Sequence, residues 1–156
     1  MENNLDPIDV ATQFVGTNKR SIFNDWFYAT KGIATAYCGT FVSYCRQMGG
    51  MPLARMDYMR GFASVPFAVK FFKEKNQLTD KPQRNDLVFF DWSGHKTNFE
   101  HTGLFKHDNG DGATFTSIEG NTSNPDVPNS NNQSNGGWVI EKIRPYTCAI
   151  FAHPVN

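Results

Sequence analysis

The sequence has no excess of charge of either sign, because its 156 residues include 15 Lys and Arg against 15 Asp and Glu. A protein that binds nucleic acid usually carries a basic excess, so this balance argues against such a partner. Long apolar runs are also lacking, and no stretch approaches the length that is needed to span a bilayer. We therefore expect neither a nucleic acid nor a membrane as a partner.

Cysteine is scarce, with three residues at positions 38, 45 and 148. Three cysteines cannot all pair within one chain, and the spacing from Cys38 to Cys45 is too long for a zinc knuckle. The first residues, 1–6, have neither the basic nor the apolar region of a signal peptide. We expect a chain without a disulfide framework that is made in the cytoplasm, so that any action on a cell wall or in a periplasm follows release or delivery.

The length predicts a single domain over residues 1–156, and 14 Phe provide for an ordered core. Apolar spacing and capping residues predict helices in the first half, at 6–16, 21–28, 38–48 and 64–78. Apolar or alternating runs between Gly- and Asn-rich turns predict strands at 87–92, 102–105, 113–119, 138–143 and 148–152. This order predicts an α+β fold, with N-terminal helices packed on a curled antiparallel sheet of five to six strands.

The helix at 38–48 is the element around which the chain is organised. Its apolar residues at positions 38, 41, 42, 45 and 48 lie on one face, and Gly49-Gly50 ends it. Cys38 lies in the first turn, where unpaired N–H groups and the helix dipole favour a thiolate. Cys38 is a candidate nucleophile if a histidine reaches it, and a small buried hydrophobe is the alternative. We expect Cys45 and Cys148 to lie in the core.

Of the four histidines, His101 is the candidate base. It opens a strand and is held by the strand's hydrogen bonds, whereas the other three lie in polar turns or near the C-terminus. Glu119 and Asn121 are two residues apart, so they point to the same face if the chain stays extended, and Gly120 leaves room between them. Such a pair would hold the Nδ1–H group of an imidazole and leave Nε2 for the thiol. A cysteine, a base and an orienting group together favour nucleophilic catalysis.

Four motifs in this order resemble the CHAP (cysteine, histidine-dependent amidohydrolase/peptidase) domains of the NlpC/P60 and papain-like group. The motifs are Tyr37-Cys38-Gly39-Thr40-Phe41-Val42, Pro82-Gln83-Arg84-Asn85-Asp86-Leu87-Val88-Phe89-Phe90, His101-Thr102-Gly103-Leu104 and Glu119-Gly120-Asn121-Thr122-Ser123. The resemblance covers nearly the whole chain. It implies a papain-like fold, with Cys38 as the nucleophile, His101 as the base, and Glu119 and Asn121 as orienting residues.

The chain departs from the family pattern in two places. Asn85 stands where the family has a turn glycine, and asparagine tolerates the same positive φ. Some members bind calcium through acidic residues just before the cysteine, but residues 27–37 contain no Asp or Glu. Calcium requires several oxygen ligands, including carboxylates. We therefore predict no metal ion and no cofactor.

The resemblance implies a cysteine hydrolase that cuts amide bonds in bacterial peptidoglycan, with the stem peptide as substrate. Both an N-acetylmuramoyl-L-alanine amidase and a peptide endopeptidase fit, and a peptidase for protein substrates stays open. The small size favours a monomeric phage lysin or an injected antibacterial effector, which would have an immunity or inhibitor protein as a partner, over a secreted remodelling enzyme. A catalytically silent module that binds wall fragments or a partner protein is the alternative.

Two further features bear on the substrate. Tyr37 and Trp92 are candidate walls of a substrate groove, with buried core aromatics as the alternative. The polar, Asn- and Ser-rich segment 124–137 is interpreted as a solvated surface loop, and a lid over the site is the second interpretation.

Overall fold

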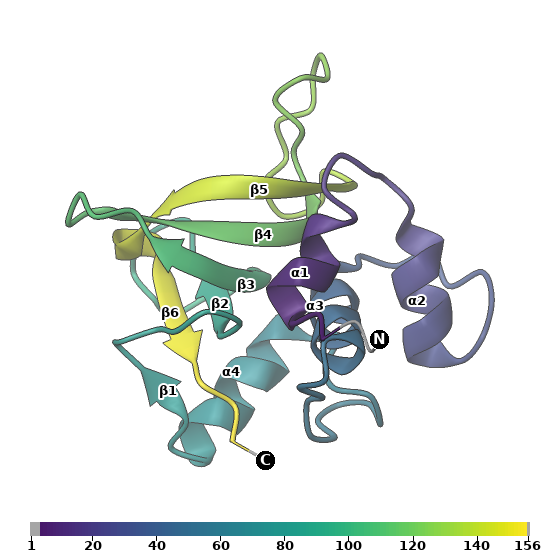
Figure 1. The fold of residues 1–156 in the computed structure, drawn as a ribbon, viewed down its shortest axis with the longest axis horizontal. Coiled ribbons are helices and arrows are strands. Elements are labelled where there is room, and N and C mark those ends of the chain that lie inside the picture. Colours follow the sequence, from purple (N-terminus) through teal and green to yellow (C-terminus); the bar gives the residue numbers. More distant parts are fainter. Residues whose placement is uncertain (1–3, 156) are drawn as a thin grey trace.

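The computed structural model describes residues 4–155 as an α+β protein, with helices packed against one antiparallel sheet (Figure 1). The helices are α1 (Pro7–Thr12), α2 (Arg20–Tyr28), α3 (Cys38–Met48) and α4 (Val65–Glu74). The strands are β1 (Leu78–Thr79), β2 (Leu87–Phe90), β3 (His101–Asp108), β4 (Thr114–Thr122), β5 (Trp138–Pro145) and β6 (Ala149–Ala152), with a 3-10 turn at Tyr146–Cys148. The predicted fold class is confirmed.

The helix starts follow from capping residues. Asp6 accepts a hydrogen bond from the N–H of Asp9 at 2.8 Å, and the carboxylate of Asp9 accepts one from the N–H of Asp6 at 3.1 Å. This reciprocal capping box, with Pro7 in the first turn, confirms the predicted start of α1. The helix ends at Thr12, earlier than expected, because the N–H groups of the next three residues bond to carbonyls three positions back. The chain therefore tightens into turns before Gly16.

Helix α3 crosses the middle of the helical layer and is buried along most of its length (Figure 1). Four of the five residues expected on its apolar face are buried: Cys38, Phe41, Val42 and Cys45. Met48 is 47% exposed, so its expected burial was wrong. Ten residues after Cys38, it lies about 80° round the helix from that cysteine and falls outside the buried stripe. All three cysteines are free, and Cys45 and Cys148 lie in the core as predicted.

The six strands follow the order β1-β6-β2-β3-β4-β5, and each neighbouring pair is antiparallel. All four residues of β2 are buried, as their apolar character predicts. The two-residue strand β1 was not predicted, because Leu78 was assigned to the preceding helix. Asn76 adopts a left-handed conformation with φ of 56° and ends the helix, which frees Leu78 to pair with Ala152 of β6.

The turn before β2 ties the sheet to the helices. Asn85 has φ of 78°, so its predicted tolerance of a glycine conformation is confirmed. Its side-chain oxygen accepts a hydrogen bond from the N–H of Ile8 at 2.9 Å, and its amide donates to Asp6 at 3.2 Å. The buried Arg46 of α3 donates to the carbonyl of Asn85 at 3.0 Å. One asparagine therefore joins α1, α3 and the sheet.

The two faces of the sheet carry separate apolar clusters. The face toward the helices includes Leu87, Phe89, Leu104 and Ile118, which pack with α1, α3 and α4. The opposite face has a cluster of its own: Val88, Phe90, Phe105, Phe115, Cys148, Ala149 and Phe151. Alternation along each strand separates the two sets. By the same alternation, the second face also carries His101 and Glu119. The candidate site residues of the sheet therefore lie on the face opposite the cluster that packs against the helices.

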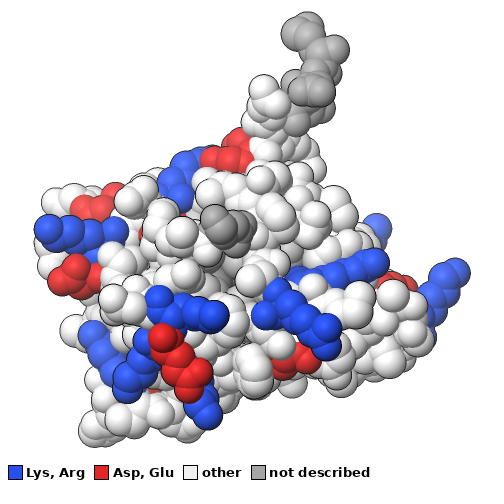
Figure 2. Space-filling view, turned by 90° about the horizontal axis from the view of Figure 1, so that it is seen from below, with Lys and Arg blue, Asp and Glu red and all other residues white. Residues whose placement is uncertain are grey.

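The connection between β4 and β5 projects beyond the sheet (Figure 1). Most residues of 125–137 are exposed or half-buried, which agrees with a surface loop. Seen from the side of α4 and the C-terminal end, Lys and Arg are interspersed with Asp and Glu over the surface (Figure 2), in keeping with the zero net charge. Within residues 4–155, no helix has both the length and the apolar character to cross a bilayer.

Candidate active site

The first turn of α3 presents Cys38 at the edge of the helical layer. The side chains of this turn pack into the core, and Cys38 itself retains 6% exposure. The side chain of the N-cap residue Tyr37 accepts no hydrogen bond from the backbone N–H groups of the first turn. These N–H groups have no partner within a helix. The cysteine therefore lies beside unpaired backbone donors, on a helix that the core holds rigidly.

His101 begins β3, opposite Phe90 of β2, and its side chain has no exposed surface. Its Nε2 atom lies 2.9 Å from Oε1 of Glu119. Its Nδ1 atom is buried and has no hydrogen-bond partner of good geometry within residues 4–155. Burial by itself lowers the pKa of His101, but interactions with the Cys38 thiol and with Glu119 outweigh it and raise that pKa to about 9. Cysteine, histidine and glutamate therefore meet at one place.

The ring nitrogens of His101 have the reverse of the predicted roles. We expected the orienting residue at Nδ1 and the thiol at Nε2, whereas Glu119 takes Nε2 and leaves Nδ1 for Cys38. The physical reason is reach. Nε2 is the nitrogen farther from the backbone, and the ring extends across the sheet toward β4, where Glu119 lies.

The carboxylate of Glu119 is fully buried and ionised. Burial alone would raise the pKa of Glu119, but hydrogen bonds from Arg144 and His101, and their charges, lower it to about 2. Gly103 gives this side chain its room, because a Cβ there would lie 2.7 Å from Cγ of Glu119. Gly120, which we expected to make room between Glu119 and Asn121, packs instead on Phe41, whose Cγ would lie 2.6 Å from an added Cβ.

Asn121 does not share the face of Glu119, so that geometric prediction was wrong. The chain is not extended there: Asn121 has φ of 60°, and the pairing of β4 with β5 shifts between Glu119 and Thr122. Its side chain turns to the β4–β5 connection, where it donates to Oδ1 of Asn135 at 2.9 Å and accepts from the N–H of Gly137 at 3.1 Å. Asn121 therefore fixes the base of the projecting loop.

The two candidate groove residues differ in position. Tyr37 has no exposed surface, stacks on Phe23 at 5.5 Å between ring centroids, and donates its hydroxyl to the carbonyl of Gly137 at 2.7 Å. For Tyr37 the core alternative is the correct one. Trp92 is half-buried and lies beside the site, with its ring centroid 5.8 Å from that of His101. Its Nε1–H group donates to Ser134 of the projecting loop at 2.6 Å.

Sequence reasoning missed Arg144 and the contribution of Ser117. Arg144 bonds to both oxygens of Glu119, with Nε 2.9 Å from Oε2 and Nη2 2.6 Å from Oε1. Ser117 donates to Oε2 at 2.5 Å. The need of a buried carboxylate for a cation was foreseeable, but the sequence does not single out one of the 15 Lys and Arg for that place.

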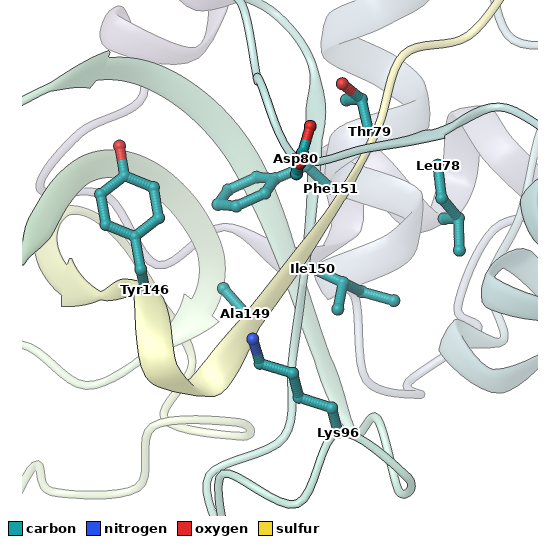
Figure 3. Close-up of a pocket in the computed structure, with 8 residues that line it drawn as sticks. All are labelled: Leu78, Thr79, Asp80, Lys96, Tyr146, Ala149, Ile150 and Phe151. Carbon is teal, nitrogen blue, oxygen red and sulfur yellow. The ribbon is translucent and has the colours of Figure 1, made fainter.

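A cavity at the surface of the sheet lies apart from these residues. This cavity of about 550 Å³ lies over β6 and is lined by Leu78, Thr79, Asp80, Lys96, Tyr146, Ala149, Ile150 and Phe151 (Figure 3). Neither Cys38 nor His101 borders it. Across residues 4–155, no three His, Cys, Asp or Glu side chains come together as a metal-binding group.

Comparison with solved structures finds a similar fold in the crystal structure of the wild-type endolysin LysIME-EF1. The TM-score is 0.50, the sequence identity is 14%, and the match covers 97% of this chain and 66% of that one. The chain thus spans less than two thirds of that endolysin, and at this identity the likeness concerns the fold. Comparison with curated protein sequences gave no match. The model of the CHAP domain family matches residues 28–121. Since this match covers more than half of the sequence and includes Cys38, His101 and Glu119, the chain belongs to the CHAP domain family.

Proposed function

We propose that the protein is a cysteine hydrolase that cleaves amide bonds in bacterial peptidoglycan. The observation that carries the proposal is the buried imidazole of His101, whose Nε2 bonds to Glu119, whose Nδ1 has no other partner within residues 4–155, and whose pKa is raised in part by the thiol of Cys38. A fixed base beside a thiol at a helix start is the arrangement that nucleophilic catalysis requires. Membership of the CHAP family and the endolysin-like fold support peptidoglycan as the substrate.

In the proposed reaction, Nδ1 of His101 first takes the proton of the Cys38 thiol, which leaves an imidazolium beside a thiolate, and the Sγ atom of this thiolate then attacks the carbonyl carbon. The tetrahedral intermediate collapses as the C–N bond breaks, and Nδ1 returns the proton to the leaving amine. Water then attacks the thioester while His101 takes its proton, which releases the acid and the free cysteine. Glu119 keeps the imidazole in the tautomer and orientation that these transfers need.

The negative charge on the carbonyl oxygen also needs donors. The N–H groups in the first turn of α3, that of Cys38 included, have no helical partner and lie beside the sulfur. In comparable enzymes one such donor is worth about 3 kcal/mol of transition-state stabilisation. Trp92, half-buried beside His101, is the proposed contact for substrate, and Asn121 acts indirectly by holding the loop residues next to Trp92.

Within this proposal the substrate is the stem peptide, and two bonds remain as candidates: that between the sugar lactate and the first alanine, and one within the stem peptide or cross-bridge. Digestion of purified peptidoglycan, followed by mass spectrometry of the fragments, identifies the bond through its new termini. The same assay addresses a lysin or an injected effector equally, because both act on the wall.

The decisive variant is Cys38→Ala, with Cys148→Ala as the matched control. Cys148 lies in the apolar cluster on the second face of the sheet, in the turn before β6, and its thiol bonds to the carbonyl of Pro145. We expect the control to clear peptidoglycan at the parent rate and Cys38→Ala to release no new termini. A Cys38→Ala protein as active as the parent would refute the assignment. An inactive parent that still binds wall fragments would identify a silent binding module instead.

A further inference from the structure

The carboxylate of Glu119 accepts four hydrogen bonds. Oε1 accepts from Nε2 of His101 and from Nη2 of Arg144, at 2.9 and 2.6 Å. Oε2 accepts from Oγ of Ser117 and from Nε of Arg144, at 2.5 and 2.9 Å. Half of the bonds therefore come from one guanidinium, whose planar fork grips both oxygens. A carboxylate held at both oxygens cannot rotate about its last bond.

Arg144 is itself fixed on several sides. It lies on β5 opposite Phe115, and its side chain is 10% exposed. Its Nη1 group donates to Oε1 of Gln133 at 2.9 Å. The guanidinium carbon lies 4.6 Å from the ring centroid of Trp92 and 5.5 Å from that of Phe90, within the range of cation–π interaction. The arginine is therefore a rigid support and not a mobile surface charge.

We propose that Arg144 is a positioning residue of the active site, which fixes the carboxylate of Glu119 so that His101 keeps Nδ1 directed at Cys38. The inference rests on the proposed function and deepens it. Without a cation, a carboxylate with no exposed surface is costly to keep ionised. A protonated or rotated Glu119 would no longer accept the Nε2–H bond at the same place, and the base would lose its orientation.

An ion pair that served only the fold would change stability when removed, without changing the chemistry of folded molecules. Enzyme kinetics distinguish a structural role of Arg144 from a positioning role. If Arg144 positions the base, its loss lowers kcat at nearly constant KM, because the misplaced group acts in the transition state. The acidic limb of the pH profile also moves to higher pH, since Glu119 then ionises less readily.

The variants are Arg144→Lys and Arg144→Met in the full chain, with Lys106→Met as the control. Lys106 forms an ion pair at the surface with Glu141 of strand β5, so the control removes an interstrand pair that does not involve Glu119. We expect Arg144→Met to lose about 100-fold in kcat. Arg144→Lys, which keeps the charge but not the fork, is expected to lie between Arg144→Met and the parent. A folded Arg144→Met protein with parental kcat and pH profile would overturn the proposal.

A second readout separates this inference from the proposed function. The rate at which iodoacetamide alkylates Cys38 reports on the imidazole beside it and needs no substrate. We expect this rate at pH 6 to 7 to fall about tenfold in Arg144→Lys, even if the parent cleaves no peptidoglycan. An unchanged alkylation rate in folded Arg144→Lys would overturn the positioning role, whatever the substrate proves to be. If Arg144→Met does not fold, Arg144→Lys carries both tests.

Discussion

Gly103 and Glu119 lie so close on adjacent strands that a Cβ at Gly103 would be 2.7 Å from Cγ of the glutamate. The Gly103→Ala change therefore pushes this side chain away from Nε2 of His101. The carbonyl oxygen of Ile118 would also lie 3.1 Å from this Cβ, and the carboxylate of Glu119 is held by four hydrogen bonds. We therefore expect a loss of stability together with a fall of about 100-fold in the rate of peptidoglycan cleavage. Initial rates, with thermal unfolding to verify the fold, measure the effect.

The control is His107→Ala, on the exposed part of the same strand β3. It should leave the rate unchanged. If Gly103→Ala cleaved peptidoglycan as fast as the control, the glycine would have no part in positioning Glu119.

Cys38 is expected to be the cysteine that iodoacetamide modifies in the folded protein at pH 6. With a pKa of about 9, His101 is protonated at this pH, and an imidazolium beside a sulfur favours the reactive thiolate. Burial raises the pKa of Cys45 well above its ordinary value, and burial also raises that of Cys148. Mass spectrometry of the digested protein locates the label.

The unfolded protein and the His101→Gln variant are the controls for the labelling of Cys38. In the unfolded protein all three cysteines should react at similar rates, and in His101→Gln the labelling at position 38 should slow. Equal labelling of all three positions in the folded parent would show that the sulfur at position 38 has no special environment.

The stability of the fold should fall as the pH rises from 6.5 to 9. The pKa of His101 is raised from 6.5 to about 9 in the folded state, so its contribution is complete below pH 6.5 and is lost as the pH passes 9. The contribution is on the order of a few kcal/mol. The Cys38→Ala variant lacks one of the interactions that raise this pKa, so its melting temperature should fall less steeply over the same range.

Melting curves of the parent, Cys38→Ala and Cys148→Ala across this pH window test the point. The Cys148→Ala protein should keep the parental slope. Parallel slopes for all three proteins would mean that the sulfur at position 38 does not interact with the imidazole in the folded state.

Removal of divalent ions is expected to leave activity unchanged. The basis is the sequence before the cysteine, where residues 27–37 offer no carboxylate for calcium. Cleavage rates with and without EDTA measure the effect. A loss with EDTA that added calcium restores would contradict the expectation.

Replacement of Asn85 by alanine should destabilise the fold more than replacement by glycine. Both changes remove the bonds to Ile8 and Asp6, but alanine also has to adopt a φ of 78°. We expect a loss of about 1 kcal/mol for Asn85→Gly and about 3 kcal/mol for Asn85→Ala in the free energy of unfolding. Urea denaturation gives both values, and equal stability of the two variants would remove the argument from backbone strain.

Local patterns were enough to predict the features that local chemistry controls. Asp6 and Pro7 mark the start of α1, the apolar spacing after Cys38 marks α3, and His101 opens a strand as expected. The prediction that Cys38, His101 and Glu119 lie together came from the resemblance to a known family. Local patterns could not predict it, because the three residues are far apart in the sequence.

The predictions that were wrong depended on backbone geometry and strand pairing, which the residue type at a single position does not determine. A left-handed residue at Asn121 turned its side chain from the imidazole to the loop, and another at Asn76 freed Leu78 from the helix. The choice between the nitrogens of His101 depends on where the neighbouring strand places Glu119. The selection of Arg144 depends on strand pairing, which aligns it with Phe115 and lets its long side chain reach along β4.

Because Arg144 of β5 holds Glu119 in place, the choice of the junction matters when such domains are recombined. The segment that matches the family model ends at residue 121, whereas the guanidinium that grips Glu119 arrives 23 positions later, at Arg144. A chimera joined at that boundary would keep Cys38, His101 and Glu119 but lose Arg144, which bonds to both oxygens of Glu119. Exchange of parts should therefore retain the hairpin as far as Pro145, or supply an equivalent cation from the new partner.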